Sequence, residues 1–75
     1  MTIGQTIKQL RLAAGRTQAD CATAAGIGQS RWADIEADRH ANPGWRTLAR
    51  VAKVLGVQFQ DLFKMGIDLS GKGQL

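Results

Sequence analysis

"GIGQSRWADIE", residues 26–36, is the stretch that decides how this sequence folds. Trp32 and Ile35 recur three residues apart, which is the spacing of one buried stripe on a helix. Gly26 and Gly28 precede that stripe, and glycine readily adopts the left-handed backbone that lets the chain turn from one helix into the next. We therefore expect a helix from about Gly28 to Ala37, with a sharp turn in front of it.

The residues before this turn predict another helix. Thr17 is a typical N-cap residue, and Asp20 three positions later makes an approximate capping box. The expected inner face of this helix consists of small residues, namely Cys21, Ala24 and Ala25. Ile27, inside the turn, is expected to enter the core. Two helices joined by only three residues have the spacing of a helix-turn-helix.

Helical spacing also governs the rest of the sequence, which has no alternating strand pattern. One apolar face near the N-terminus consists of Ile3, Ile7, Leu10 and Ala14, and Gly15 can close that helix. Asn42-Pro43 predicts the start of a fourth helix, because asparagine caps helices and proline suits the first helical position. The expected core face of that helix consists of Trp45, Leu48, Val51, Ala52 and Leu55, before Gly56.

The C-terminal part predicts one more short helix and then a tail. The apolar residues of this fifth helix are Val57, Phe59, Leu62 and Phe63. Residues 65–75 contain three glycines and show no sustained helical period. We therefore expect an all-α fold, with a compact five-helix domain over residues 1–64 and a C-terminal tail over residues 65–75.

Length and composition exclude several classes of protein. Seventy-five residues allow one domain with a modest core. Cys21 is the single cysteine, so no internal disulfide can form, and no apolar run approaches the ~20 residues of a membrane span. With one cysteine, one histidine (His40) and no phosphate-cradling glycine motif, the sequence predicts no enzyme, no metal and no cofactor. We expect a soluble, cytoplasmic protein.

The charge distribution is uneven along the chain. The formal net charge is +4, yet residues 17–38 carry a net charge of −3, with Arg31 as their only cation. Residues 1–16 carry +3 and residues 39–53 carry +4, so basic segments flank the acidic centre on both sides. Phosphates can run past such flanking segments while the central helix meets base edges, so this balance permits DNA binding without demonstrating it.

The face of the 28–37 helix that is not buried carries the candidate readers. At 100° per residue, with Trp32 and Ile35 inward, the outward residues are Gln29, Ser30, Ala33, Asp34 and Ala37, with Arg31 on the flank. This face is narrow, because small residues alternate with hydrogen-bonding ones. Its shape is compatible with the major groove of DNA.

At this point the sequence resembles a known family. "TQADCATAAGIGQSRWADIEAD", residues 17–38, is similar to the Cro/repressor-type helix-turn-helix, also called the xenobiotic-response-element family, whose domains are lambda-repressor-like. The shared features are a Thr-Gln opening, an alanine five residues after the threonine, the turn glycine and an Ile-Glu close. The flanks "IKQLRLAAGRTQ" and "NPGWRTLARVAKVLGVQFQDLF" also resemble the family, so the likeness covers residues 3–63.

The resemblance implies base contacts for the outward residues. Gln29 would read the edge of an adenine base, and Ser30 would reach a neighbouring base. Arg31 would bind either a guanine or a phosphate, and Ala33 would touch a thymine methyl group. At the position of Asp34, family members often carry a polar residue that reads a base, so an acidic residue is a departure from the family pattern. The Asp34 carboxylate would either accept a hydrogen bond from a cytosine amine or repel a phosphate.

The resemblance also implies backbone contacts and a structural ion pair. Gln18 would bond a phosphate and brace Gln29, and Arg11 would bridge the first helix to Glu36 on the third. The candidate DNA-backbone contacts are Thr17, Gln18, Arg39, His40, Asn42 and Arg46. For Arg39, Arg46 and His40 a plain solvated surface is the alternative. Trp32 and Trp45 are both expected in the core.

The function implied is sequence-specific binding of double-stranded DNA by a transcriptional regulator, as a dimeric repressor of a near-palindromic operator. Phe59, Phe63 and Met65 are the candidate dimer interface, because they are apolar beyond what a small monomer leaves exposed. One alternative is an antitoxin or a restriction-modification controller protein of the same fold. Another is a protein-interaction adaptor that reads no bases. The tail is a candidate for binding a protein partner.

Overall fold

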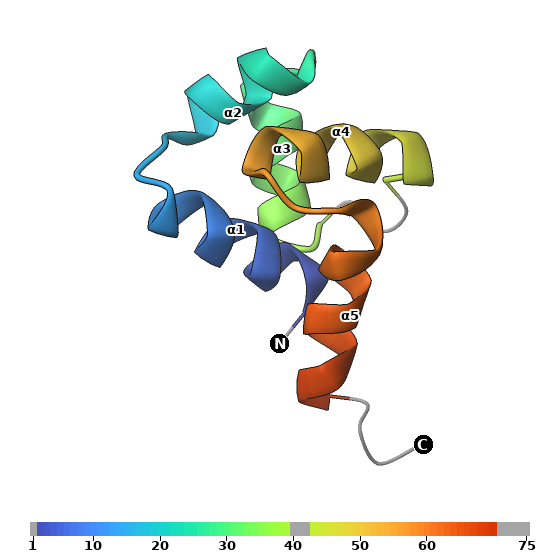
Figure 1. Cartoon of the computed structure of the whole chain (residues 1–75). Helices are drawn as coiled ribbons and strands as arrows, with labels where there is room; N and C mark the ends of the chain where they lie inside the picture. Colours follow the sequence, from blue (N-terminus) through green and yellow to red (C-terminus); the bar gives the residue numbers. More distant parts are fainter. Residues whose placement is uncertain (1, 40–42, 71–75) are drawn as a thin grey trace.

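The computed structural model describes residues 2–39 and 43–70, with backbone alone for residues 65–70. This part of the chain is all-helical and contains no strand. Its helices are α1 (Ile3–Ala13), α2 (Gln18–Ala25), α3 (Gln29–Glu36), α4 (Trp45–Leu55) and α5 (Phe59–Ser70). The prediction of a five-helix all-α fold is confirmed. Figure 1 shows α3 behind α4 in this view, where it packs beside α1 and α2, and α5 extending away from the other helices.

Capping residues set the start of the first two helices. Thr2 Oγ1 accepts a hydrogen bond from the backbone N–H of Gln5, whose side chain accepts in turn from the N–H of Thr2, so α1 begins with a complete capping box. Thr17 Oγ1 accepts from the N–H of Asp20 at 3.0 Å, which confirms Thr17 as the cap of α2. Gly15 and Gly26 both have positive φ, as predicted for the ends of these helices.

One core fills the space between the helices. It consists of Ile7, Cys21, Ala22, Ala25, Trp32, Ile35, Leu48, Val51, Ala52 and Leu62. Ile27 is half-buried against this core, as expected. The inner face of α2 differs from the prediction, since Ala22 is buried and Ala24 is exposed. On the helix, Ala22 and Ala25 lie on the same side of Cys21, and Ala24 lies on the other side.

Ala14 is also exposed rather than part of the core face of α1. It follows the last residue of that helix as its C-cap, and the chain turns away there. The core contribution of α1 therefore comes from Ile7, with Ile3 and Leu10 packed partly buried against the cluster.

The start of α4 corrects two predictions. The helix begins at Trp45 with Gly44 as its N-cap (φ 85°), so Pro43 precedes it instead of opening it, and Asn42 lies outside the described residues. Trp45 is 65% exposed, and its prediction as a core residue is wrong. Leu48, Val51 and Ala52 are buried, whereas Trp45 lies at the edge of their stripe in the first turn.

The last helix is longer than predicted. α5 continues through Ser70, six residues into the segment expected to be a tail. A glycine such as Gly66 costs a helix about 1 kcal/mol relative to alanine but does not forbid it. Leu62 is the fully buried anchor of α5.

Candidate nucleic-acid interface

The turn between α2 and α3 has the geometry that the glycines predict. Gly26 is left-handed (φ 73°), and the N–H of Ile27 returns to the carbonyl of Ala22 at 3.0 Å, which closes the end of α2. Gly28 is the N-cap of α3. The connection is therefore short and hydrogen-bonded, and it fixes the angle at which α3 leaves α2.

α3 is held from behind by a buried carboxylate. Glu36 Oε2 accepts from Arg11 Nε at 2.6 Å, and Glu36 Oε1 accepts from Arg11 Nη2 at 3.1 Å. Trp32 Nε1 donates to Oε2 at 2.6 Å, and Gln18 Nε2 donates to Oε1 at 2.9 Å. One side chain thus binds donors from α1, α2 and α3 itself.

These bonds also set the protonation of Glu36. Burial alone raises the pKa of a carboxyl group, because it disfavours the charged form. The hydrogen bonds from Arg11, Gln18 and Trp32, together with the Arg11 charge, outweigh burial and bring the pKa of Glu36 below its ordinary value. Glu36 is therefore a carboxylate at neutral pH.

The position of Gln18 differs in part from the expectation. Its amide was expected to brace Gln29, but the hydrogen bond that the structure shows for it goes to Glu36. Gln18 sits at the first position of α2, half-buried. It is oriented by the buried network and not by the outward residue that it was expected to support.

The outward side of α3 presents its polar first turn to solvent. Gln29, Ser30 and Arg31 are exposed, and Ala33 and Asp34 are half-buried. Arg31 Nη2 donates to Thr47 Oγ1 at 3.3 Å, which directs the guanidinium toward α4. The five predicted base readers therefore share one helix, with Arg31 at its α4 side.

Asp34, the acid in this face, has a cationic neighbour. Arg39 Nε lies 3.4 Å from Asp34 Oδ1, with 71% of the Arg39 side chain and 48% of the Asp34 side chain exposed. An exposed pair of this kind is worth little for stability. Its effect is instead to offset the negative charge at the face where phosphates would approach.

A shallow hollow of about 330 Å³ lies beside the outward face of α3. Its lining residues are Lys8, Gln18, Ala33, Glu36, Ala37 and Arg39. Two cations, Lys8 and Arg39, thus border a concave surface at the side of the candidate reading helix. Sequence reasoning missed Lys8. The signal was present, because Lys8 lies three residues before Arg11 and so shares the side of α1 that faces α3.

The remaining candidates lie elsewhere or outside the described residues. Arg46 is exposed at the start of α4, with its guanidinium 5.5 Å from the centre of the Trp45 ring. His40 and Asn42 lie outside the described residues, as does the side chain of Met65. Phe59 and Phe63 form an edge-to-face pair with ring centres 5.1 Å apart.

The described part of the chain also bears on metal binding, membrane spanning and thiol reactivity. Within residues 2–39 and 43–70 no group of three or more histidine, cysteine or acidic side chains is placed to hold a metal ion. No helix among the described residues is both long and apolar enough to span a membrane. Cys21 is buried, and burial raises the pKa of its thiol, which makes the group unreactive.

The fold and the turn define a Cro/repressor-type helix-turn-helix domain. A family model described as "Helix-turn-helix domain" matches residues 2–63, and the chain belongs to that family. Among curated proteins it is 47% identical over 58 residues to the immunity repressor protein of Bacillus phage phi105, covering 77% of this chain and 40% of that protein. It is 34% identical over 73 residues to the HTH-type transcriptional regulator SinR of Bacillus licheniformis, covering 97% of this chain.

The chain thus spans about 40% and 66% of the lengths of these two curated relatives. A solved structure of the biofilm master regulator SinR in complex with DNA matches with a TM-score of 0.77 and 35% identity over 83% of this chain and 98% of that one. A SinR–SinI protein complex matches with a TM-score of 0.81 and 30% identity, over 97% of this chain and 71% of that chain.

Proposed function

We propose that this chain binds double-stranded DNA sequence-specifically through α3 and acts as a transcriptional repressor. The observation that carries the proposal is the exposed first turn of α3, held in place from behind by the buried Glu36 network. Rigid support behind a polar helix start is what direct reading of base edges needs. The likeness to repressors, and to a SinR structure that contains DNA, supports the same function.

In this proposal each outward residue of α3 has a role. Gln29 forms paired bonds with an adenine, Ser30 contacts the neighbouring base and Ala33 contacts a thymine methyl group. Arg31 donates a hydrogen bond to Thr47 on α4 in the unbound protein. It either breaks this bond and binds a guanine, or keeps its present position and binds a phosphate. Asp34, offset by Arg39, accepts from a cytosine amine.

Phosphate contacts come from the residues around α3. Lys8 and Arg39 border the hollow beside the helix, and Gln18 lines it. The other proposed contacts are Thr17 at the start of α2, Arg46 at the start of α4, and His40 and Asn42. The net negative charge of residues 17–38 does not prevent phosphates from approaching α3. The charge of Glu36 is paired with Arg11 inside the protein, and the charge of Asp34 is offset by Arg39.

The active form in this proposal is a homodimer. Phe59, Phe63 and Met65 on α5 form its interface, supported by the 38% exposure of Phe63. Two copies of α3 would then read half-sites about 34 Å apart, one turn of the double helix. An antitoxin or a controller protein would use the same reading face, with a different set of partners. The SinR–SinI complex is one case of a related regulator with a protein partner.

Selection from a random pool of duplexes at about 150 mM salt tests this function. We expect enrichment of a near-palindromic motif with two half-sites. Enrichment of one unpaired half-site would support base reading but contradict the proposed homodimer. Binding without enrichment that disappears as salt rises would contradict sequence-specific recognition and favour the adaptor alternative.

A further inference from the structure

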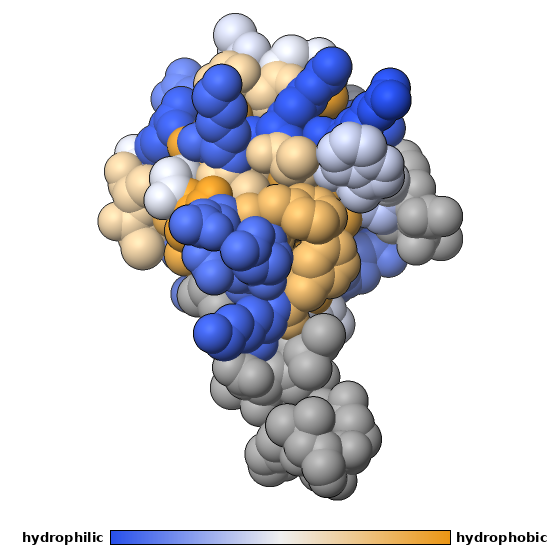
Figure 2. Space-filling view, turned by 45° about the vertical axis from the view of Figure 1, so that its right-hand side comes forward, coloured by the Kyte–Doolittle hydropathy of each residue, from blue (hydrophilic) through white to orange (hydrophobic). Residues whose placement is uncertain are grey.

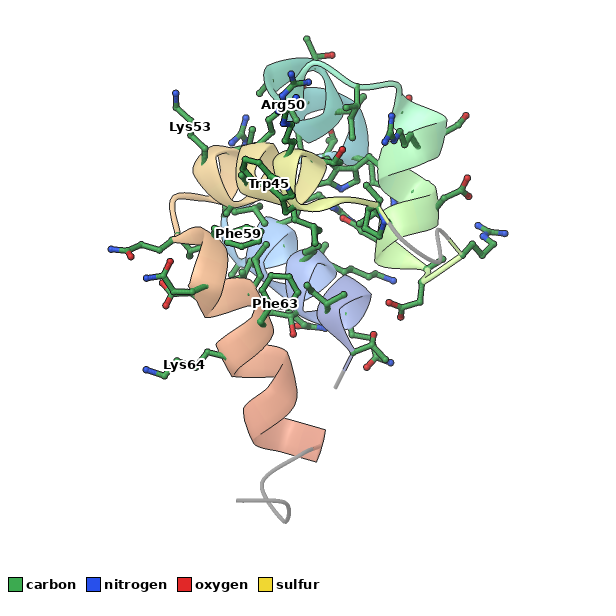
Figure 3. All side chains as sticks on the ribbon, turned by 90° about the vertical axis from the view of Figure 1, so that its right-hand side faces the viewer. Trp45, Arg50, Lys53, Phe59, Phe63 and Lys64 are labelled. Carbon is green, nitrogen blue, oxygen red and sulfur yellow. The ribbon has the colours of Figure 1, made fainter. Side chains whose placement is uncertain are left out.

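A second surface of the molecule is unlike the reading face. Trp45, the aromatic pair Phe59–Phe63 and the cations Arg50, Lys53 and Lys64 all lie on the face that Figure 3 presents, with α3 at its edge. We call these six residues the aromatic-basic surface. Trp45 is 65% exposed and Phe63 38%, and all three cations are exposed. Figure 2 shows the corresponding arrangement, with apolar surface next to strongly hydrophilic side chains.

The spacing of α4 explains why Arg50 and Lys53 point to solvent. Arg50 and Lys53 are three residues apart and lie on the solvent side of α4, opposite buried Leu48 and Val51. Trp45 lies between that solvent side and the core stripe. α4 contains three cations and no acidic residue, so the part of the surface that α4 forms has one sign of charge. On α5, Asp61 lies between Phe59 and Phe63 in the sequence and accepts a hydrogen bond from the backbone N–H of Gln58.

The proposed DNA contacts do not use most of this surface. Figure 3 shows α3 at the edge of this face, away from Phe63 and Lys64, and none of the residues that line the hollow beside α3 belongs to the aromatic-basic surface. Stacking of unpaired bases is also disfavoured. Arg46 covers the ring of Trp45 at 5.5 Å, and Phe59 and Phe63 meet edge to face, so these rings do not present a row of parallel platforms.

From this placement we propose that the aromatic-basic surface docks an acidic amphipathic helix of a partner protein. The apolar side of such a helix would cover Trp45 and Phe63, and its carboxylates would pair with Arg50, Lys53 and Lys64. A second copy of this chain fits less well, because self-pairing across α4 would place cations opposite cations. The docking goes beyond the proposed DNA reading and competes with self-pairing through Phe59 and Phe63.

Trp45 provides the measurement. The chain has two tryptophans, and Trp32 is buried, so a change in emission on docking reports Trp45. The probe is a synthetic helical peptide of about 18 residues, with leucines at helical spacing and glutamates beside them. We expect a saturable blue shift with the 75-residue chain, and no shift with a matched peptide that carries lysine in place of glutamate.

Two variants separate specific docking from general attraction. Arg50→Gln/Lys53→Gln should weaken peptide binding about tenfold, whereas the charge-matched control Lys8→Gln/Arg39→Gln should change it less than about twofold. Trp45→Phe should abolish the shift, and circular dichroism checks that each variant is folded. Equal weakening by both double variants would overturn the proposal, as would the absence of a peptide-dependent shift.

The other occupants give distinct results. A blue shift that grows with protein concentration without peptide would assign the surface to a second copy. Quenching by a single-stranded oligonucleotide, with no response to the peptide, would assign it to nucleic acid. Both results contradict the proposal. Because the peptide titration contains no DNA, its failure is independent of any failure of the proposed DNA reading by α3.

Discussion

The carboxylate of Glu36 lies 2.6 Å from the guanidinium of Arg11, and this contact joins α1 to the last turn of α3. Both side chains are nearly buried, and the bond from Trp32 to the same carboxylate ties it to the core. The orientation of the candidate reading helix therefore depends on an ion pair that lies behind it.

Replacing Glu36 by glutamine should destabilise the protein. The substitution leaves the Arg11 charge buried without a counter-charge, and we expect the free energy of unfolding to fall by about 3 kcal/mol. Urea denaturation at pH 7 measures this. Asp34→Asn is the matched control, since it removes a carboxylate of the same helix whose pair with Arg39 is exposed, and it should cost less than about 1 kcal/mol. Similar losses for both variants would contradict a special role for the buried pair.

The same pair predicts a dependence of stability on pH. The pKa of Glu36 is lower in the folded protein than in the unfolded chain, so the unfolded chain takes up this proton first as the pH falls. The stabilisation that the Glu36 carboxylate provides is complete at pH values above the pKa of Glu36 in the unfolded chain. It is lost as the pH falls through the lower pKa of Glu36 in the folded protein. The difference in unfolding free energy between wild type and Glu36→Gln should therefore narrow between about pH 5 and pH 3. A constant difference would show that Glu36 does not titrate in this way.

Gly4 should not tolerate a side chain, although it lies within a helix. A Cβ atom there would lie 2.5 Å from the carbonyl oxygen of Ile35 and 2.7 Å from that of Glu36. Gly4→Ala should cost about 2–3 kcal/mol, although alanine normally favours a helix. Gly28→Ala, with open space around its Cβ, should change stability by less than about 1 kcal/mol. Thermal melts compare the two, and a neutral Gly4→Ala would contradict the close approach of α1 to α3.

Gln29→Ala tests base reading directly. Against the selected duplex it should cost about 1–3 kcal/mol and relax the preference at one base position in each half-site. Gln9→Ala is the matched control, because Gln9 is exposed on α1 and lies away from the side of Gly4 and Arg11 that faces α3. Fluorescence anisotropy on single-base variants of the duplex gives the measurement. An unchanged preference would exclude Gln29 as a reader.

Arg46→Ala should act differently from Gln29→Ala. A lost phosphate contact weakens binding to all sequences alike and reduces the slope of log affinity against log salt by about 1. Anisotropy titrations at several salt concentrations, with the selected duplex and an unrelated one, provide the test. Loss of affinity for the selected duplex alone would assign Arg46 to a base instead.

The parts of the fold that the sequence predicted are those set by local chemistry. Thr17 caps a helix because of its own hydroxyl, and Gly26 turns the chain because it lacks a side chain, so neither needs knowledge of the tertiary structure. The buried positions of Trp32 and Ile35 followed from spacing alone.

The predictions that failed depended on where a helix begins and on what lies across from it. Trp45 fits the apolar spacing, but the helix starts at that residue, and the ring lies at the edge of the buried stripe. The close contact at Gly4 and the bond between Gln18 and Glu36 join segments far apart in the chain, which spacing within one helix cannot reveal. The base and phosphate contacts stay predictions.

The residues that hold α3 and the residues proposed to read DNA form separate sets. Trp32, Ile35 and Glu36 hold the helix, whereas the side chains of Gln29 and Ser30 make no hydrogen bond within the described part of the chain. Substitution of Gln29 or Ser30 should therefore change the free energy of unfolding very little. In the proposed function, evolution can therefore change operator preference one surface residue at a time, and a different set of reading residues can be engineered onto α3, without loss of the fold.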